Sequence, residues 1–221
     1  MFPRRALILS SLMLLLVTAQ EVCYASPLFL LMVTEELRIT YFSARIKQQS
    51  ELNVCRQATE FTCGPAALAS LMTFYYHDPT TEVDIMRMSH TLERRTTSLT
   101  GLSEACTAKG YQATGYRMSL QELLQQVEKD GVPVLVHFET PTHHFSLVEG
   151  QVGDYILMND PGCGQTTILK DDFMRRWSGK ALVVKSSRPA DREMLHTRKK
   201  SAELRLDSLK KSLQSLTPFH M

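Results

Sequence analysis

The chain has 221 residues, of which 43% are hydrophobic and 22% are charged, and its formal net charge is +2. These values lie near the globular average, so they exclude a disordered chain and a polytopic membrane protein. The nearly balanced charge and the lack of a recognisable nucleic-acid-binding motif give no support for a nucleic-acid partner. We expect one domain of ordinary size with an appendage at each end.

The N-terminal segment has the pattern of a secretory signal peptide. Arg4 and Arg5 precede an apolar run over residues 6–19, and small residues follow at the candidate cleavage sites. We therefore predict a signal peptide at 1–25 and a periplasmic or secreted protein. An uncleaved membrane anchor stays open as an alternative, because residues 28–33 are apolar again.

An N-terminal extension at 26–52 contains a candidate strand at 37–46, where β-branched and aromatic residues are mixed. Helical composition follows further along the chain. Ser119 and Glu122 form a capping box at the start of the most amphipathic of these helices. The helices are predicted at 65–76, 82–89, 102–109 and 119–129.

The hydrophobic pattern then changes to short β-rich runs separated by turn residues. Because the helices come first and the strands later, the sequence predicts an α+β domain with an N-terminal helical half and a C-terminal antiparallel sheet. The domain is expected at 53–186. Its strands are predicted at 111–116, 133–138, 145–150, 155–158 and 181–185.

The C-terminal region, 187–221, carries leucines among many Lys and Arg residues and predicts a basic amphipathic helix. Two interpretations remain open for this helix. Either it packs on the domain with a solvated outer face, or it presents a surface to anionic lipid or to a partner protein.

Cys63 is the first candidate for chemistry, because it lies where a polar loop meets a predicted helix, in Thr62-Cys63-Gly64-Pro65. The unpaired N–H groups at a helix N-terminus stabilise a thiolate, which is the nucleophilic form of cysteine. A buried structural cysteine is the competing interpretation.

Three further residues complete a candidate catalytic set. Gln57, six residues before Cys63, can donate its side-chain amide to an oxyanion together with the Cys63 backbone N–H. His144 directly precedes the strand predicted at 145–150 and is the natural base for a thiol, whereas its neighbour His143 points to the other face. Asp160, at the end of the next strand, can orient the imidazole.

This pattern resembles the C39 family of papain-like peptidases. The resemblance rests on Gln57-x5-Cys63-Gly64-Pro65, His144-Phe145 and Asp160-Pro161-x-Cys163-Gly164, and it extends over about 53–185. It implies a papain-like fold and a cysteine peptidase in which Gln57 is the oxyanion donor, Cys63 the nucleophile, His144 the base and Asp160 the orienting residue. The expected partner is a peptide or protein substrate, and we expect neither a cofactor nor a metal. The best-known relatives are cytosolic domains of ABC exporters that cut after Gly-Gly, whereas this chain has an export signal.

Several alternatives accompany this prediction. A C39-like module could bind a peptide for a secretion system without turnover, and a related acyl transfer could hydrolyse a non-peptide amide. A zinc site from Cys55, Cys63, His143 and His144 lacks the Cys-x2-Cys spacing of such sites. At most one disulfide can form among Cys55, Cys106 and Cys163, and the sequence does not select the pair.

Overall fold

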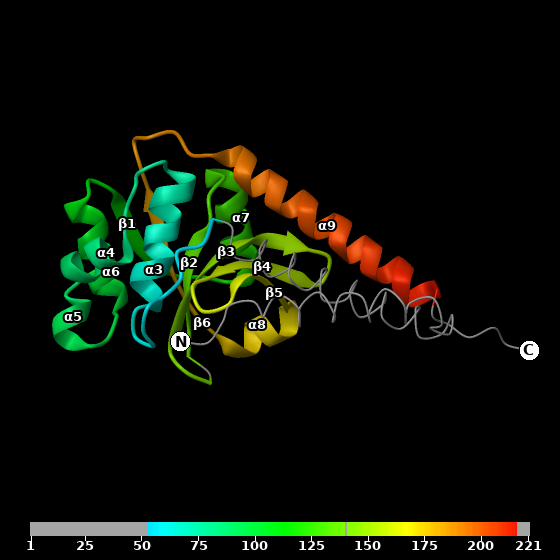
Figure 1. Cartoon of the computed structure of the whole chain (residues 1–221), viewed down its shortest axis with the longest axis horizontal. Coiled ribbons are helices and arrows are strands. Elements are labelled where there is room, and N and C mark those ends of the chain that lie inside the picture. The colour runs from blue at the N-terminus through cyan, green and yellow to red at the C-terminus, as the bar shows by residue number, and fades with distance from the viewer. Residues whose placement is uncertain (1–52, 140, 216–221) are drawn as a thin grey trace, which may run out of the picture. The chain divides into compact units, whose positions relative to one another are not determined.

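A computed structural model of the chain describes residues 53–139 and 141–215 (Figure 1). The predicted signal peptide, the extension at 26–52 and the candidate strand at 37–46 lie outside the described residues. The helical elements are α3 (Cys63–Ser70), the π-helical turn η1 (Leu71–Tyr75), α4 (Glu82–Met88), α5 (Thr91–Arg94), α6 (Leu99–Ala108), α7 (Leu120–Asp130), α8 (Lys170–Arg176) and α9 (Arg192–Ser215). The strands are β1 (Gln112–Arg117), β2 (Val134–Phe138), β3 (His144–Val152), β4 (Tyr155–Asp160), β5 (Gly164–Leu169) and β6 (Trp177–Lys185).

The first helix begins two residues earlier than predicted. Cys63 is its first residue, so Pro65 stands third rather than first, where a missing N–H still leaves no intrahelical bond unmade. Near its end Ser70 donates to the Ala66 carbonyl at 2.9 Å and accepts the Cys55 N–H at 2.8 Å. The helix then widens into η1, so the single predicted helix is two elements.

Capping residues explain the bounds of the next helices. The Ser119–Glu122 capping box of α7 is confirmed, with both reciprocal hydrogen bonds present. Helix α6 begins three residues before its prediction, because the Ser98 side chain accepts the Gly101 N–H and caps it there. The short helix α5 was not predicted from the sequence.

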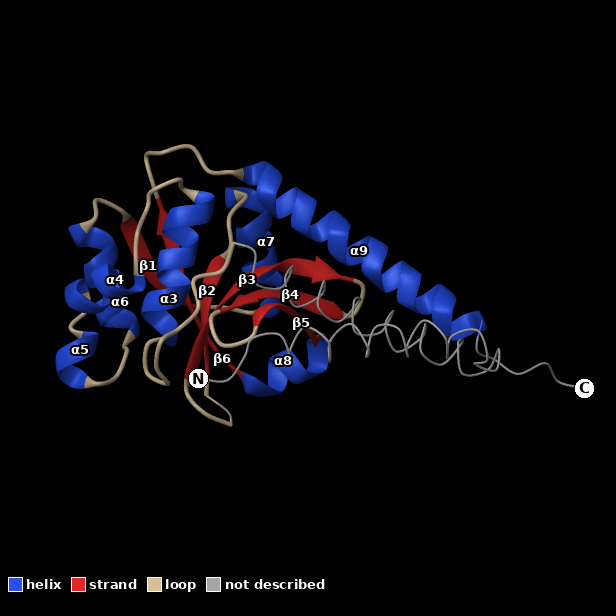
Figure 2. Ribbon diagram, in the orientation of Figure 1, coloured by secondary structure: helices blue, strands red, loops and turns tan. Residues whose placement is uncertain are grey.

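All six strands form one antiparallel sheet in the order β1-β6-β2-β3-β4-β5. The prediction that β2, β3 and β4 are antiparallel neighbours is confirmed, and so is the α+β class (Figure 2). Strand β5 and helix α8 were not predicted, because the polar residues Gln165–Thr167 give β5 no hydrophobic run. Pairing with β4 makes this segment an edge strand.

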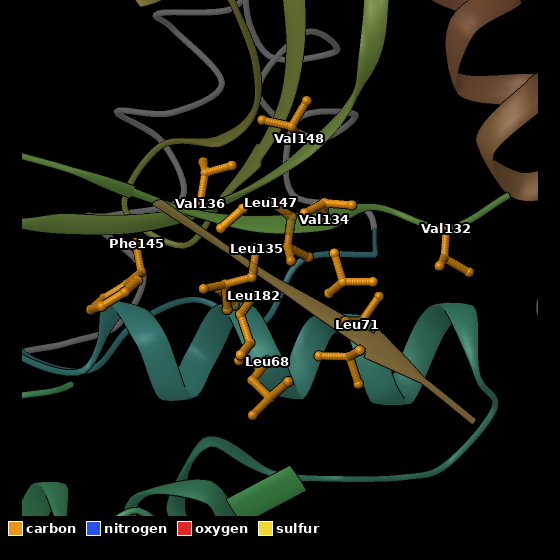
Figure 3. Packing of buried hydrophobic residues seen from close by; sticks show 14 of the residues in the cluster. Leu68, Leu71, Val132, Val134, Leu135, Val136, Phe145, Leu147, Val148 and Leu182 are labelled. Atoms are coloured by element: carbon orange, nitrogen blue, oxygen red, sulfur yellow. The ribbon is translucent and has the colours of Figure 1, made fainter. Parts of the chain in front are cut away.

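The core lies between α3 and the sheet. Leu68 of α3 and Leu71 of η1 face Leu135, Leu147 and Leu182 of the central strands, and all five side chains are buried (Figure 3). Side chains alternate between the two faces of a strand, so the packing of these leucines fixes which residues of β2 and β3 reach the helix. This packing holds the start of α3 beside the start of β3.

The predicted C-terminal helix is confirmed as α9, which packs first on β3 and then extends past the sheet (Figure 1). Leu195 near its start is 4% exposed, whereas Leu204 and Leu209 are 64% and 55% exposed. Across the described part of the chain, every helix is too short or too polar to cross a bilayer. Contact of the second half of α9, which carries Leu204 and Leu209, with lipid or a partner protein stays a prediction.

Candidate active site

Cys63 begins α3 at the end of a tight turn. The Thr62 side chain does not cap the helix, because its hydroxyl donates to the Thr59 carbonyl at 3.0 Å and accepts the Thr59 N–H at 3.1 Å. The first-turn N–H groups are therefore uncapped by Thr62, and they point their partial positive charge at the thiol.

Gly64 allows the helix start to pack closely against its neighbours. A Cβ atom at this position would lie 2.4 Å from Thr97 Cγ2, 3.0 Å from Leu102 Cδ1 and 3.2 Å from the Phe145 ring. These contacts leave no room for a side chain. Because Phe145 follows His144 in β3, the absence of a side chain at Gly64 brings the nucleophile and base candidates together.

His144 lies between a thiol and a carboxylate. Its Nε2 is 2.7 Å from Asp160 Oδ2, and its imidazole also forms a hydrogen bond with Cys63. Burial lowers the pKa of His144, but the hydrogen bonds and charges of Asp160 and Cys63 outweigh it and raise this pKa to about 10. His144 is therefore an imidazolium at neutral pH, held between Asp160 and the candidate nucleophile.

Asp160, the last residue of β4, is held by both of its oxygens. Oδ2 faces His144, while Oδ1 accepts the backbone N–H groups of Gly162 and Cys163 at 2.8 and 2.9 Å. Burial raises the pKa of Asp160, but His144 and these two N–H groups lower it below its ordinary value. The end of β4 thus supplies the carboxylate, and the turn that follows supplies the N–H groups that keep it ionised.

Gln57 lies beside this pair. Its backbone N–H donates to the Pro161 carbonyl at 3.0 Å, which ties the loop before α3 to the turn after Asp160. Its side-chain Nε2 donates one hydrogen to the Thr59 carbonyl at 2.9 Å, and the second amide hydrogen is available for an oxyanion. Its Oε1 is buried without a hydrogen-bond partner in the described structure.

The two neighbouring histidines diverge, as strand alternation predicts. His143 turns away from Asp160 and stacks on His137 with ring centroids 5.3 Å apart and a ring-nitrogen distance of 3.3 Å. Burial, with the charges of His143 and Lys180, lowers the pKa of His137. Only His144 of this pair reaches the carboxylate.

Two residues around the site were not found from the sequence. The Phe138 ring stacks on His144 with 6.4 Å between centroids, and the Arg56 guanidinium donates to the Gly162 carbonyl. Phe138 lies directly opposite His144 in the β2–β3 hairpin, so the hairpin register could have revealed it. Arg56 gave no such signal, because its contact spans more than one hundred residues of sequence.

The zinc alternative finds no support in the described residues, where no three His, Cys, Asp or Glu side chains are grouped as metal ligands. The cysteines at 55, 63, 106 and 163 are all free thiols. Cys106 is fully buried, and burial raises its pKa to about 12. It is therefore an unreactive thiol, whereas Cys63 has a base beside it.

Comparison with other proteins supports one family. The sequence pattern of the Peptidase C39 family matches residues 51–188. An uncharacterised protein of Methanothermobacter thermautotrophicus is 30% identical over 138 residues, which cover 62% of this chain and 90% of that protein. The probable functional amyloid protease FapD of Pseudomonas aeruginosa is 25% identical over 146 residues, which are 63% of each protein. The chain therefore matches less than two thirds of FapD.

Solved structures share the fold. The peptidase domain of Streptococcus ComA, a bi-functional ABC transporter of a quorum-sensing pathway, has a TM-score of 0.54 at 23% identity, over 62% of this chain and 97% of that domain. A double glycine motif protease from an AMS/PCAT transporter, in complex with its leader peptide, has a TM-score of 0.52 at 25% identity, over 61% of this chain and 91% of that one. The fold is that of papain-like C39 peptidase domains.

Proposed function

Because this chain belongs to the peptidase C39 family, we propose that it is a cysteine endopeptidase that hydrolyses a peptide or protein. The observation that carries the proposal is the position of His144, which is hydrogen-bonded to Cys63 on one side and lies 2.7 Å from the Asp160 carboxylate on the other. Nucleophile, base and orienting residue in this order are the requirements for covalent acyl transfer.

In the proposed reaction the Cys63 thiolate attacks the scissile carbonyl carbon. The developing oxyanion accepts the Cys63 backbone N–H and the free amide hydrogen of Gln57. The His144 imidazolium gives its proton to the leaving amine, and a thioester remains on Cys63. His144 then takes a proton from water, which attacks the thioester and releases the acid, while Asp160 holds the imidazole in place.

Two relatives support a proposal for the substrate class. One solved neighbour is a double glycine motif protease bound to a leader peptide, and a sequence relative is a probable amyloid protease. We propose a substrate with small residues before the scissile bond, cut as an extended chain. An internally quenched peptide with a Gly-Gly pair before the scissile bond is the first substrate to test.

The purified chain, its Cys63→Ala variant and a Cys163→Ala variant test the proposal. Among the described cysteines Cys163 is the exposed one, so its replacement controls for loss of a reactive cysteine elsewhere. We expect cleavage and labelling by a thiol-directed probe in the wild type and Cys163→Ala, and neither in Cys63→Ala. Peptide binding without cleavage by the wild type would favour a binding module instead.

Export is a second part of the proposal. The basic pair Arg4-Arg5 and the apolar run at 6–19 support a signal that is removed before Gln20 or Ser26. The peptidase would then act outside the cytosol on an exported peptide or protein. Mass spectrometry of the protein from its native compartment tests this, and an intact Met1 on a chain found only in the cytosol would overturn it.

A further inference from the structure

The start of α9 packs on the peptidase domain, although α9 lies after residues 51–188, which match the family. The Asp191 backbone N–H donates to the Tyr75 carbonyl at 2.8 Å, and Leu195 is buried in the core. Gly150 of β3 has a φ of 140°, and a Cβ atom there would lie 2.5 Å from Lys199 Cε. Close packing of α9 against β3 thus brings Arg198, the neighbour of Lys199, to the strand.

Arg198 reaches a buried carboxylate. Glu149 is 0% exposed and lies where the β3–β4 register shifts, between Val148 and Gly150. It forms an ion pair with the Arg198 guanidinium, whose side chain is 13% exposed. Burial raises the pKa of Glu149, while Arg198, Tyr75 and Asn159 act against this rise. Since guanidinium stays charged in proteins, the pair keeps a buried charge compensated.

The other partners of Glu149 come from the elements that carry the catalytic site. The Tyr75 hydroxyl donates at 2.5 Å from η1, which continues the helix of the nucleophile. Glu149 itself lies five residues after the base in the same strand. The Asn159 side chain, in the residue before the orienting aspartate, also forms a hydrogen bond with Glu149.

Asn159 extends this network to the fourth catalytic element. Its Nδ2 donates at 2.8 Å to the Asn53 carbonyl, four residues before the oxyanion donor Gln57. Its backbone carbonyl accepts the Ser146 hydroxyl at 3.1 Å across β3 and β4. Two atoms of this network, Asn159 Oδ1 and Arg198 Nη1, are buried without a hydrogen-bond partner in the described structure. The hydrogen bonds that are formed still restrain the relative positions of the members, because each displaced partner leaves a further buried group unpaired. The segments that carry the four candidate catalytic residues therefore all include or contact Glu149 or Asn159. These candidates are Gln57, Cys63, His144 and Asp160.

We propose that Arg198 is a positioning residue for the peptidase: from the C-terminal helix it pairs with Glu149 and so fixes the strands of His144 and Asp160 against the helix of Cys63. The inference rests on the proposed peptidase function. It assigns α9 a role inside the catalytic domain, apart from any contact of its outer half. Small displacements of a reacting group lower the rate strongly while binding changes little.

Four variants test this role: Arg198→Met, Arg198→Lys, the double variant Glu149→Met/Arg198→Met, and Lys200→Met as a control on an exposed position of the same helix. The single methionine variant leaves Glu149 buried without its counter-ion. The double variant removes both charges, so it is expected to regain stability but not the hydrogen bonds to Tyr75 and Asn159. Thermal unfolding, hydrolysis of the quenched Gly-Gly peptide and alkylation of Cys63 by iodoacetamide at pH 6 are measured for each.

We expect the double variant to unfold near the wild-type temperature. Its kcat should be at least about 10-fold lower, whereas its KM should change less than about 3-fold. Its Cys63 should be alkylated more slowly than that of the wild type. A double variant with both stability and kcat of the wild type would show that the network only stabilises, and would overturn the proposal. If neither methionine variant folds, Arg198→Lys decides in the same way, since a lysine ammonium cannot reproduce the planar guanidinium contact.

The alkylation measurement separates the two proposals. A wild type that never cleaves the peptide refutes the peptidase function, yet its Cys63 alkylation rate still reports how His144 is positioned at the thiol. Equal alkylation rates in the wild type and the folded Arg198 variants overturn the positioning role alone. The Lys200→Met control is expected to match the wild type in every measurement.

Discussion

Replacement of Asp160 gives the strongest test of how the site works. In Asp160→Ala the His144 imidazolium loses an acceptor at 2.7 Å, and the backbone N–H groups of Gly162 and Cys163 lose theirs. Asp160→Asn is the matched variant, because its amide oxygen still accepts a hydrogen bond but carries no charge. The pair of variants separates orientation of the imidazole from stabilisation of its charge.

A hydrogen bond to a charged group contributes about 1.5–3 kcal/mol. Each 1.36 kcal/mol is tenfold in rate, so Asp160→Ala should lower kcat by about 10–150-fold and Asp160→Asn by less. Asp160 is also one of the groups that raise the pKa of His144 to about 10. The alkaline limb of kcat/KM, which reports loss of the imidazolium, should therefore move to lower pH in both variants.

Stability gives an independent readout with a defined sign. The pKa of His144 is raised from its ordinary 6.5 to about 10 in the folded state. The contribution of His144 to the free energy of unfolding is therefore complete below pH 6.5 and is lost as the pH rises toward 10. The pKa of Asp160 is lowered, so its contribution is present above the unfolded pKa and is lost in acid. Thermal unfolding from pH 3 to 10 should show both losses in the wild type and weaker ones in Asp160→Ala. An unchanged alkaline limb together with unchanged pH dependence of unfolding would refute the charge pairing of His144 and Asp160.

The remaining predictions concern the other site residues. His144→Ala should lower kcat by orders of magnitude, whereas His143→Ala should change kcat less than about 3-fold, because only His144 faces the Asp160 carboxylate. The reverse ranking in steady-state assays would show that His143 is the base. Gln57→Ala should lower kcat about 10²-fold or more with a smaller change in KM, as loss of one oxyanion donor does, and an unchanged kcat would leave Gln57 a structural link to the turn after Asp160. With iodoacetamide at pH 6, peptide mapping should find Cys63 modified fastest and the buried Cys106 unmodified in the native protein.

The sequence by itself determined the features that depend on neighbours along the chain. The capping box of Ser119 and Glu122 fixes the start of α7, because both hydrogen bonds close within one turn. The placement of Cys63 at a helix N-terminus and the divergence of His143 and His144 also follow from local periodicity. These local rules were sufficient for the α+β class and for the strands β2 to β4.

Only the tertiary structure decided the features that depend on distant partners. Strand β6 inserts between β1 and β2, and the polar strand β5 exists because β4 offers it unpaired N–H and C=O groups. The pairing of Arg198 with Glu149 joins residues 49 positions apart and carries no periodic signal. A helix face of mixed leucine and basic residues has the same sequence pattern whether the face packs on the domain or is exposed to solvent. Which basic side chain is buried depends on the carboxylate that folding brings beneath it.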